Sequence, residues 1–488
     1  MMFGKFGTTL ALAVLATAPV WAQQSVRAPH EQMHMQRHGE MQMVEPVYPQ
    51  LGRAQERSAE KLFTLDDARR LAAASNPTLR QAEAEIRAAK ARTQQAGLYP
   101  NPSVGYTGDE IRGGSVNGGK QGFFVEQSVV TGGKLGKARA VFEQEERVAE
   151  LEAQEQKTRV ETSVKIAFYR VLAAQELLEL RRDLSQIGQM VQESEDELAR
   201  TGQFDETEQL QTQIEVKRLH LADLEQENVL REQWRRLAAV IGEPDLPQAA
   251  VAGDLEHGWP EINEEQILET IANLSPAVGI ADASAARANA EIARAKSQVI
   301  PDINALGGLE YNNEPLGSVP PHAIGWEGLA ELSVQLPIFN RNQGNIAEAR
   351  ADFDRAQLEK QRVQLLLRER AASLLDQYAT ARVVATQYRE QILPLAKQAN
   401  TLMTEKYGQM LAAYPRMLGA RRKHFELATE YVQTLETVWA TSLALQGFLL
   451  TDGLAEPASA SEFPHAAGEI NPLSSTRTLM PAEQMPLP

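Results

Sequence analysis

Thioether and imidazole side chains gather in one short stretch near the N-terminus. Three histidines and four methionines lie between residues 30 and 43, namely His30, Met33, His34, Met35, His38, Met41 and Met43. Both side-chain types are ligands that suit Cu(I), and imidazole also suits zinc and Cu(II). The three histidines would share one face if the stretch were helical. The pattern predicts a flexible arm over residues 23–60 that captures metal; the alternative is an unselected polar linker, since such tracts are compositional signals.

The rest of the chain offers no catalytic constellation. The remaining histidines are scattered without the spacing of an HExxH motif, and no glycine-rich phosphate loop follows a predicted strand. The chain contains no cysteine, which excludes disulfides, thiolate metal sites and an acylated N-terminal cysteine. A formal net charge of −16 argues against a nucleic-acid partner. We therefore expect neither an enzyme nor a bound cofactor.

Residues 1–22 are typical of a secretory signal peptide. Lys5 supplies the positive charge, residues 8–18 are apolar but too few to span a bilayer, and Val20 and Ala22 suit a cleavage site. A buried N-terminal helix is the alternative. No later apolar run approaches the ~18 residues of a membrane-spanning helix. If the protein lies in a membrane, we expect it to do so as a β-barrel.

Two pairs of long helices are predicted by apolar residues at coiled-coil spacing. Residues 137–201 contain no proline and repeat apolar side chains at intervals averaging near 3.5 residues. At ~1.5 Å per residue this helix would be roughly 97 Å long, wider than an ordinary globular core. A return helix over 205–242 would complete an antiparallel rod. A second pair is predicted over 345–407 and 411–450, with a kink at Pro394.

Two shorter stretches alternate apolar and polar residues, as β-strands do. Residues 103–130 and 302–336 each predict a β-hairpin. Such alternation fits a sheet with one lipid-facing and one wet face, or a soluble sheet packed on helices. No leftover apolar helix is available to cover a soluble sheet, which favours the first alternative. In the clearest strand, the apolar residues Trp326, Ala330, Leu332, Val334 and Leu336 alternate with Glu327, Glu331, Ser333 and Gln335.

This order of elements occurs twice in the chain. Pro77 recurs as Pro276 after 199 residues, and Trp234 recurs as Trp439 after 205 residues. The spacing drifts mainly in the second hairpin loop, where insertions are tolerated. The predicted organisation is a signal peptide (1–22), the arm (23–60), a first repeat (61–242, with hairpin 103–130, long helix 137–201 and return helix 205–242), a linker (243–262), a second repeat (263–450, with hairpin 302–336, long helix 345–407 and return helix 411–450) and a tail (451–488).

Four strands per chain cannot close a barrel by themselves. An open sheet edge in lipid would leave backbone groups unpaired, so several chains must share one barrel. Two copies would give eight strands around a filled interior, whereas three would give twelve strands around a channel. The long helices would continue the wall of the pore.

The chain resembles the TolC-type outer-membrane efflux factors over roughly residues 62–450. Its overall sequence character is most similar to their heavy-metal (Czc/Cus-like) branch. The resemblance rests on the duplicated order of elements and on local signatures: Asn76-Pro77, Ser275-Pro276, Pro100-Asn101-Pro102, Leu336-Pro337-Ile338-Phe339 and the helix segment 164–175. It implies a fold class that is mainly α with a small β part. Long antiparallel α-helical coiled-coil hairpins would form a periplasmic tunnel, and four strands per chain would contribute to a shared trimeric 12-stranded transmembrane β-barrel.

The same resemblance implies the function and the partners. The chain would be the outer-membrane exit duct of a tripartite efflux system in a Gram-negative bacterium, projecting into the periplasm as a homotrimer. An RND-type inner-membrane pump and a periplasmic membrane-fusion adapter would deliver the cargo. Heavy-metal cations are expected, copper or silver before cobalt, zinc or cadmium. The alternatives are a soluble periplasmic coiled-coil adapter or scaffold, and a similar duct for drugs or secreted proteins.

In this family a glycine marks the tip of each helical hairpin, and the residues around it dock the adapter. The matching positions are Thr201, Gly202, Gln203 and Phe204 in the first half and Tyr407, Gly408, Gln409 and Met410 in the second. Plain turn chemistry is the alternative, because glycine tolerates positive φ at a helix C-terminus.

Acidic residues just past the tips narrow the aperture in well-known family members. Asp205, Glu206 and Glu208 fit that role in the first half, with a solvated helix start as the alternative. In the second half Tyr414 and Met417 stand where acids would be expected, a departure that argues against a symmetric acidic gate. Glu126 and Glu331 are candidates for the barrel lumen, or simply polar filling of a wet sheet face.

Overall fold

The computed structural model describes residues 62–109, 119–200, 206–316, 322–409, 411–412 and 414–457, all within one unit of the chain. The arm predicted to bind metal and the predicted signal peptide lie outside these residues. So do Thr201, Gly202, Gln203, Phe204, Asp205 and Met410 of the predicted tips.

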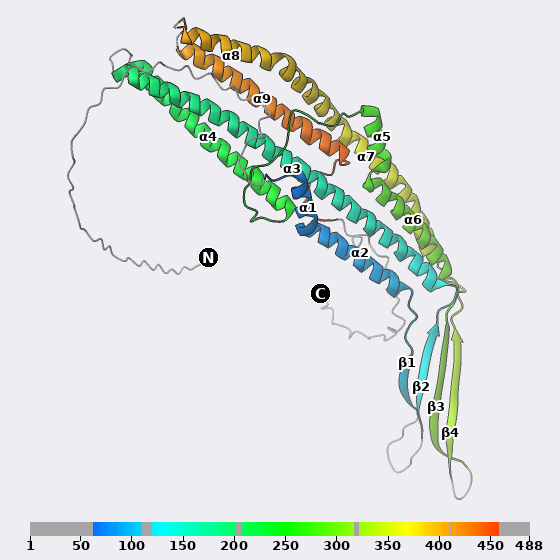
Figure 1. The fold of residues 1–488 in the computed structure, drawn as a ribbon. Coiled ribbons are helices and arrows are strands. Elements are labelled where there is room, and N and C mark those ends of the chain that lie inside the picture. The colour runs from blue at the N-terminus through cyan, green and yellow to red at the C-terminus, as the bar shows by residue number, and fades with distance from the viewer. Residues whose placement is uncertain are drawn as a thin grey trace, which may run out of the picture. The chain divides into compact units, whose positions relative to one another are not determined.

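The two halves of the chain repeat one order of elements (Figure 1). The first half comprises α1 (Leu65–Ser75), α2 (Pro77–Ala96), β1 (Ser103–Asp109), β2 (Lys120–Val129), α3 (Lys134–Arg200) and α4 (Glu206–Ile241). The second comprises α5 (Glu264–Leu274), α6 (Pro276–Ser297), β3 (Ile303–Leu316), β4 (His322–Val334), α7 (Gln343–Gln387), a π-helical turn η1 (Tyr388–Ile392), α8 (Leu393–Gly408) and α9 (Tyr414–Gln446).

The short helices of each half break at an X-Pro pair. Proline disfavours helical backbone in the residue before it, and it is well tolerated as the first residue of a helix. Asn76 is accordingly extended, and its side chain accepts the backbone N–H of Thr78 at 2.9 Å, which caps α2. Ser275 occupies the same place before α6 without a side-chain cap. These breaks let α1 and α5 turn away from the helices that follow them.

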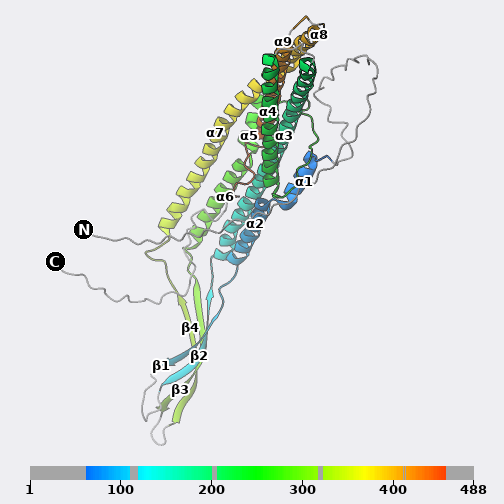
Figure 2. The same cartoon turned by 90° about the vertical axis from the view of Figure 1, so that its left-hand side faces the viewer.

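The longest helix, α3, has 67 residues and contacts α1, α2, α4, α6 and α9 (Figures 1 and 2). Its partner α4 approaches closely at Gly188, where an added Cβ would lie 2.9 Å from Cδ1 of Leu219. The small residue therefore permits the close packing of the first hairpin. The second hairpin, α7 to α9, packs on α3 through α9.

The proline inside the second long helix is accommodated by a change of helix type. Pro394 is in the first turn of α8, directly after the π-helical turn Tyr388–Ile392. Proline removes a backbone donor and its ring crowds the preceding turn, so one wider turn relieves the strain. The Tyr388 hydroxyl donates to Glu430 Oε2 at 2.5 Å, and its ring stacks on Tyr431. The predicted kink therefore takes the form of a π turn tied to α9.

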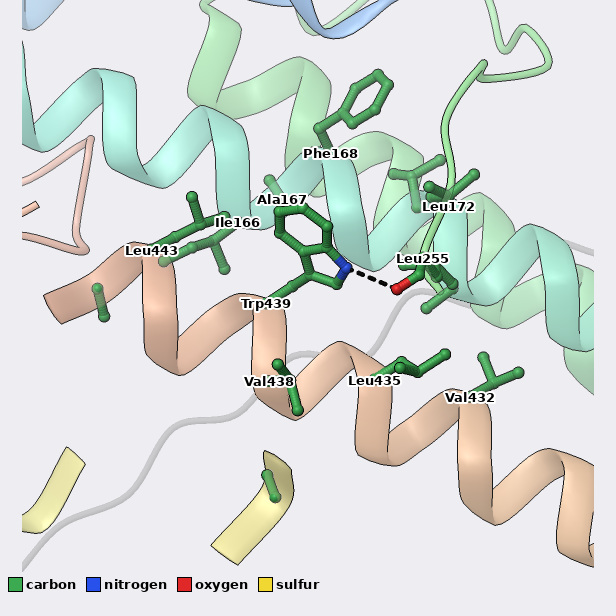
Figure 3. Close-up of a cluster of buried hydrophobic side chains, with 14 of the residues drawn as sticks. Ile166, Ala167, Phe168, Leu172, Leu255, Val432, Leu435, Val438, Trp439 and Leu443 are labelled. Atoms are coloured by element: carbon green, nitrogen blue, oxygen red, sulfur yellow. Dashed lines mark hydrogen bonds between the residues drawn. The ribbon is translucent and has the colours of Figure 1, made fainter. Parts of the chain in front are cut away.

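Two tryptophans from equivalent places in the repeat hold the segment that joins the halves. Trp439 Nε1 donates to the backbone oxygen of Leu255 at 3.0 Å, as Figure 3 shows within its cluster of buried side chains. Trp234 Nε1 donates to the backbone oxygen of Leu246 at 2.9 Å. The ring of Tyr169 stacks on Trp439 with centroids 3.9 Å apart. The segment predicted as a linker is thus part of the core.

Candidate functional site

The four strands form one antiparallel sheet in the order β1-β2-β3-β4, so the two hairpins lie side by side. β2 and β3 join the halves, with Val129 opposite Ile303 and Lys120 opposite Asn312. Residues directly opposite one another in a sheet point to the same face. The register therefore determines which side chains from the two halves share a surface.

One face of this sheet carries no charged side chain over the paired residues 103–109, 120–129, 303–312 and 325–334. Its larger apolar side chains are exposed, and Leu332 is 77% accessible. We call this the apolar face. Its members are Val104, Tyr106, Gly108, Gln121, Phe123, Val125, Gln127, Val129, Ile303, Ala305, Gly307, Leu309, Tyr311, Trp326, Gly328, Ala330, Leu332 and Val334.

Aromatic residues of the apolar face lie toward the end of the sheet that is farther from the helices. Tyr106 meets Phe123 edge to face at 5.7 Å between centroids, and Tyr311 meets Trp326 in the same way at 5.5 Å. Amphipathic rings favour the boundary between hydrocarbon and water. An apolar face with an aromatic row at one end is the pattern expected of strands that face lipid.

The opposite face carries all the charges of the paired strand residues. Leu306 lies between the two predicted lumen residues, since it is opposite Glu126 on one side and Glu331 on the other. The structure therefore brings both glutamates onto one face, two strands apart. Together with them, this polar face holds Asp109, Lys120, Glu310 and Glu327.

A charge cluster on the polar face was missed by the sequence analysis. Lys120 Nζ lies 3.3 Å from Glu327 Oε2 and 3.7 Å from Glu310 Oε1. The Asn312 amide lies 3.3 Å from the same Glu327 oxygen. Strand alternation places Glu327 on the same face as Glu331, because the two residues are an even number of positions apart. Only the pairing of β3 with both β2 and β4 places Lys120 beside Glu310 and Glu327.

At the tip of the second hairpin, the structure describes the predicted glycine, Gly408. Gly408 is the last residue of α8 and is not among the glycines with positive φ, so its own backbone conformation does not require glycine. Apart from its chain neighbours and the backbone of its own helix, no described atom lies within 4 Å of the place that a Cβ on Gly408 would occupy. Gln409 ends the helix instead, with its N–H directed to the backbone oxygen of Glu405. Gly408 thus leaves an open surface at the tip.

The gate candidates are placed only in part. Glu206 and Glu208 lie in the first turn of α4, and Tyr414 is the first residue of α9, but their side chains are outside the description. Met417 is buried and does not offer a lining surface. Tyr407 lies close to Glu195 of α3, and burial together with that charge raises the pKa of the Tyr407 hydroxyl.

Between the tips and the sheet, a network of buried and partly buried acids and arginines joins α2, α3 and α6. Arg287 Nε donates to Glu145 Oε1 at 2.9 Å, and Arg92 Nε lies 3.9 Å from the other oxygen of Glu145. Arg92 also donates to Glu85 of its own helix at 2.7 Å. Two turns along α3 from Glu145, the Glu152 side chain is 7% exposed, and its Oε2 has no hydrogen-bond partner among the described residues. Burial, and then the charges of Glu155 and Glu85, raise the pKa of Glu152 to about 7.

Glu152→Gln should stabilise the protein at pH 8 and flatten its pH dependence. The raised pKa means that the ionised carboxylate opposes folding; this cost is fully present above about pH 7 and disappears below the ordinary carboxyl pKa. We expect a gain of about 2 kcal/mol at pH 8 and little change at pH 4.5. Thermal unfolding across this range measures it. The exposed control Glu83→Gln should change stability by less than about 0.5 kcal/mol; an equal gain at every pH for Glu152→Gln would contradict the assignment.

Neither a membrane-crossing helix nor a metal-binding cluster is found in the described part of the chain. None of its helices combines the length and apolarity that crossing a membrane requires. No group of three or more His, Cys, Asp or Glu side chains within it could hold a metal ion.

Two matched halves with paired helical hairpins, and a sheet with one charge-free face, define the subunit of an outer-membrane channel. The chain belongs to the outer membrane efflux protein family, whose model matches residues 68–243 and 267–448. The match falls on the two halves separately. The predicted resemblance to TolC-type efflux factors is therefore confirmed.

Known relatives agree with this assignment. The cobalt-zinc-cadmium resistance protein CzcC of Cupriavidus metallidurans is 24% identical over 404 residues, which cover 83% of this chain and 92% of CzcC. The crystal structure of CusC superposes with a TM-score of 0.64 at 16% identity, covering 83% of this chain and 97% of CusC. The outer membrane protein VceC of Vibrio cholerae gives a TM-score of 0.61 at 17% identity, covering 80% and 96%. The predicted fold class, mainly helical with long hairpins and a small four-stranded sheet, is confirmed.

Proposed function

We propose that three copies of this chain form a passive exit duct in the outer membrane of a Gram-negative bacterium. The observation that carries the proposal is the sheet, which has one face free of charge and two unpaired edges, β1 and β4. Backbone groups on an open edge cannot be left unpaired in lipid. Pairing β4 of one copy with β1 of the next would remove every edge, and three copies would supply twelve strands.

The two faces of the sheet then acquire distinct roles. The apolar face would contact lipid, and the polar face would line the lumen. Each copy adds five acidic residues and one lysine from the paired strand residues to that lining. A narrow pore with such a lining favours cations over anions. Glu126 and Glu331 would be two of these lining groups.

The helices would continue the duct into the periplasm. Hairpins α3–α4 and α8–α9 end in the predicted docking tips, and the open surface at Gly408 suits close approach by another helix. A periplasmic membrane-fusion adapter would bind there and link the duct to an RND-type pump, which supplies the energy. Asp205, Glu206 and Glu208 would form an acidic ring on the first hairpin, with Tyr414 in the corresponding place on the second.

Heavy-metal cations are the proposed cargo. The similarity to CzcC, a cobalt-zinc-cadmium resistance protein, supports this class of cargo. The histidine- and methionine-rich arm suits Cu(I), and by chemical likeness Ag(I). We therefore place copper and silver first and cobalt, zinc and cadmium second. No chemistry on the cargo is needed, because a duct only conducts.

Conductance and membrane location test this function together. The full-length protein should pellet with the outer membrane as a heat-sensitive oligomer and should conduct in a planar bilayer with a preference for cations. The double variant Glu126→Gln, Glu331→Gln should still conduct, but its ratio of cation to anion permeability should fall about twofold or more, because charges in the lining are removed. The control Asp66→Asn removes an exposed charge on α1 and should leave the ratio unchanged. A soluble monomer that never conducts would refute the proposal.

Cargo is tested in cells. Deletion of the gene should increase sensitivity to copper and silver more than to cobalt, zinc or cadmium, and re-expression of the full chain should restore resistance. Unchanged sensitivity to all five metals, in a strain whose duct is shown to conduct, would contradict the cargo class and leave the duct in place.

A further inference from the structure

The connections between the sheet and the helices expose a group of large apolar side chains. Phe339 is 91% accessible, more than any other large apolar residue described. It lies five residues after Val334, the last residue of β4. We call this group the collar; its members are Leu98, Tyr99, Leu336, Ile338 and Phe339, all more than half accessible.

The topology gathers the collar at one level. β1 and β3 begin, and β2 and β4 end, at the end of the sheet nearest the helices. The helices α2, α3, α6 and α7 reach the sheet at this end (Figure 1). Leu98 and Tyr99 precede the edge strand β1, whereas the other three follow the opposite edge strand β4. If β4 of one copy pairs with β1 of the next, these two parts of the collar meet at each junction between copies.

The collar lies about one membrane thickness from the aromatic row of the apolar face. Leu336 is ten residues after Trp326 and two residues after the end of β4 at Val334. At ~3.3 Å per residue and a tilt of roughly 40°, ten residues span about 25 Å along a barrel axis. This is the height of the apolar band in outer-membrane barrels. The collar is therefore continuous with the apolar face and marks its end nearest the helices.

Positive side chains without acidic partners lie at the same level. Lys137, Lys296 and Arg341 make no ion pair with any described residue. Other cations there are neutralised: Lys134 pairs with Asp302 at 2.8 Å, and Arg139 and Arg294 pair with glutamates of their own helices. These three cations lie beside the apolar collar in a chain whose formal net charge is −16. We call these three residues the junction cations.

We propose that the collar and the junction cations bind anionic phospholipid in the periplasmic leaflet of the outer membrane. The collar would contact acyl chains near the headgroups, and Lys137, Lys296 and Arg341 would meet the phosphates. Lipid of this charge fits because cations near a membrane surface attract anionic headgroups, and because apolar rings beside them remain in hydrocarbon. This inference rests on the proposed function, since it requires the sheet to be in the membrane.

The experiment uses full-length trimers in nanodiscs of phosphatidylcholine with phosphatidylglycerol as a minor component. The lipids that remain bound after mild detergent extraction are counted by mass spectrometry. We expect phosphatidylglycerol to be enriched about fivefold or more over its bulk fraction, given the usual attraction of a cation to an anionic surface. The triple variant Lys137→Gln, Lys296→Gln, Arg341→Gln should bring the ratio back to the bulk value.

A matched triple variant on α4 controls for net charge. Lys217→Gln, Arg218→Gln and Arg235→Gln remove three exposed charges far along the chain from the junction and should retain the enrichment. Phe339→Ala should lower the total number of lipids retained without changing trimer stability in detergent. A loss of trimer in detergent would instead show that Phe339 packs against the next copy, which would overturn the collar.

The outcomes separate this inference from the proposed function. Trimers that conduct but retain the two lipids in their bulk ratio would overturn the inference and leave the duct intact. An equal loss of enrichment in both triple variants would also overturn it, because general charge would then explain the effect. Failure of the unaltered protein to enter membranes or to conduct would overturn both.

Discussion

Leu332→Arg should prevent the protein from being retained in the outer membrane. Leu332 is on the apolar face between the aromatic row and the collar, and is 77% exposed. An arginine near the midplane of a transmembrane barrel costs about 2–4 kcal/mol. In the proposed trimer three copies would carry this cost in one assembly, so the effect would be multiplied. We expect the variant to be lost from the outer-membrane fraction and its heat-sensitive oligomer to disappear from gels.

The neighbouring residue provides the matched control. Ser333 follows Leu332 directly but points to the polar face, opposite Asn304. Ser333→Arg introduces the same side chain into the wet side of the sheet, where it should be tolerated and should reduce the preference for cations. Adjacent residues of a strand point to opposite faces of the sheet. Equal behaviour of the two variants would therefore contradict the assignment of the faces.

Trp439→Ala should produce the largest loss of stability in the helical part. The indole is 5% exposed, stacks on Tyr169 at 3.9 Å and donates to the Leu255 backbone oxygen. Removing a buried tryptophan typically costs about 3–5 kcal/mol, because a cavity remains. Here it also releases the segment between the halves. Thermal or urea unfolding of the detergent-solubilised protein measures the loss.

Two further variants separate the contributions of Trp439. Trp439→Phe keeps a stacked ring but loses the N–H, and should cost about 1–3 kcal/mol for the unpaired buried carbonyl and the smaller ring. Trp234→Ala should resemble Trp439→Ala, because Trp234 is also buried and holds Leu246 of the same segment. If Trp439→Ala unfolded like the unaltered protein, the segment between the halves would not depend on these contacts.

Much of the fold follows from local sequence alone. The alternation around Glu331 predicts a strand and its two faces, because side chains in a strand alternate strictly. The long helices follow from apolar spacing, and α3 begins and ends within a few residues of the predicted 137–201. Asn76-Pro77 and Ser275-Pro276 break the short helices, since proline acts on its immediate neighbours.

Other features depend on distant contacts that local patterns do not contain. Lys120 pairs with Glu327 only because β2 and β4 both flank β3, with more than 200 residues between the two partners. The pKa of Glu152 is raised first by burial of its side chain, then by the charge of Glu155 on the same helix and by that of Glu85 on α2. The burial and the contribution of Glu85 depend on how the helices pack, which local sequence does not show. The segment between the halves was predicted as a linker from its prolines and glycines, and only the tryptophans reveal its place in the core.

The sequence by itself therefore determined the class of elements, their duplication and the two-faced character of each strand. These properties depend on backbone conformation and on side chains a few residues apart. The tertiary structure alone decided that the charge-free faces of both hairpins join into one surface, because strand register is set by pairing across the sheet. It also decided which cations at the junction have no acidic partner among the described residues, because an ion pair requires two groups to meet in space.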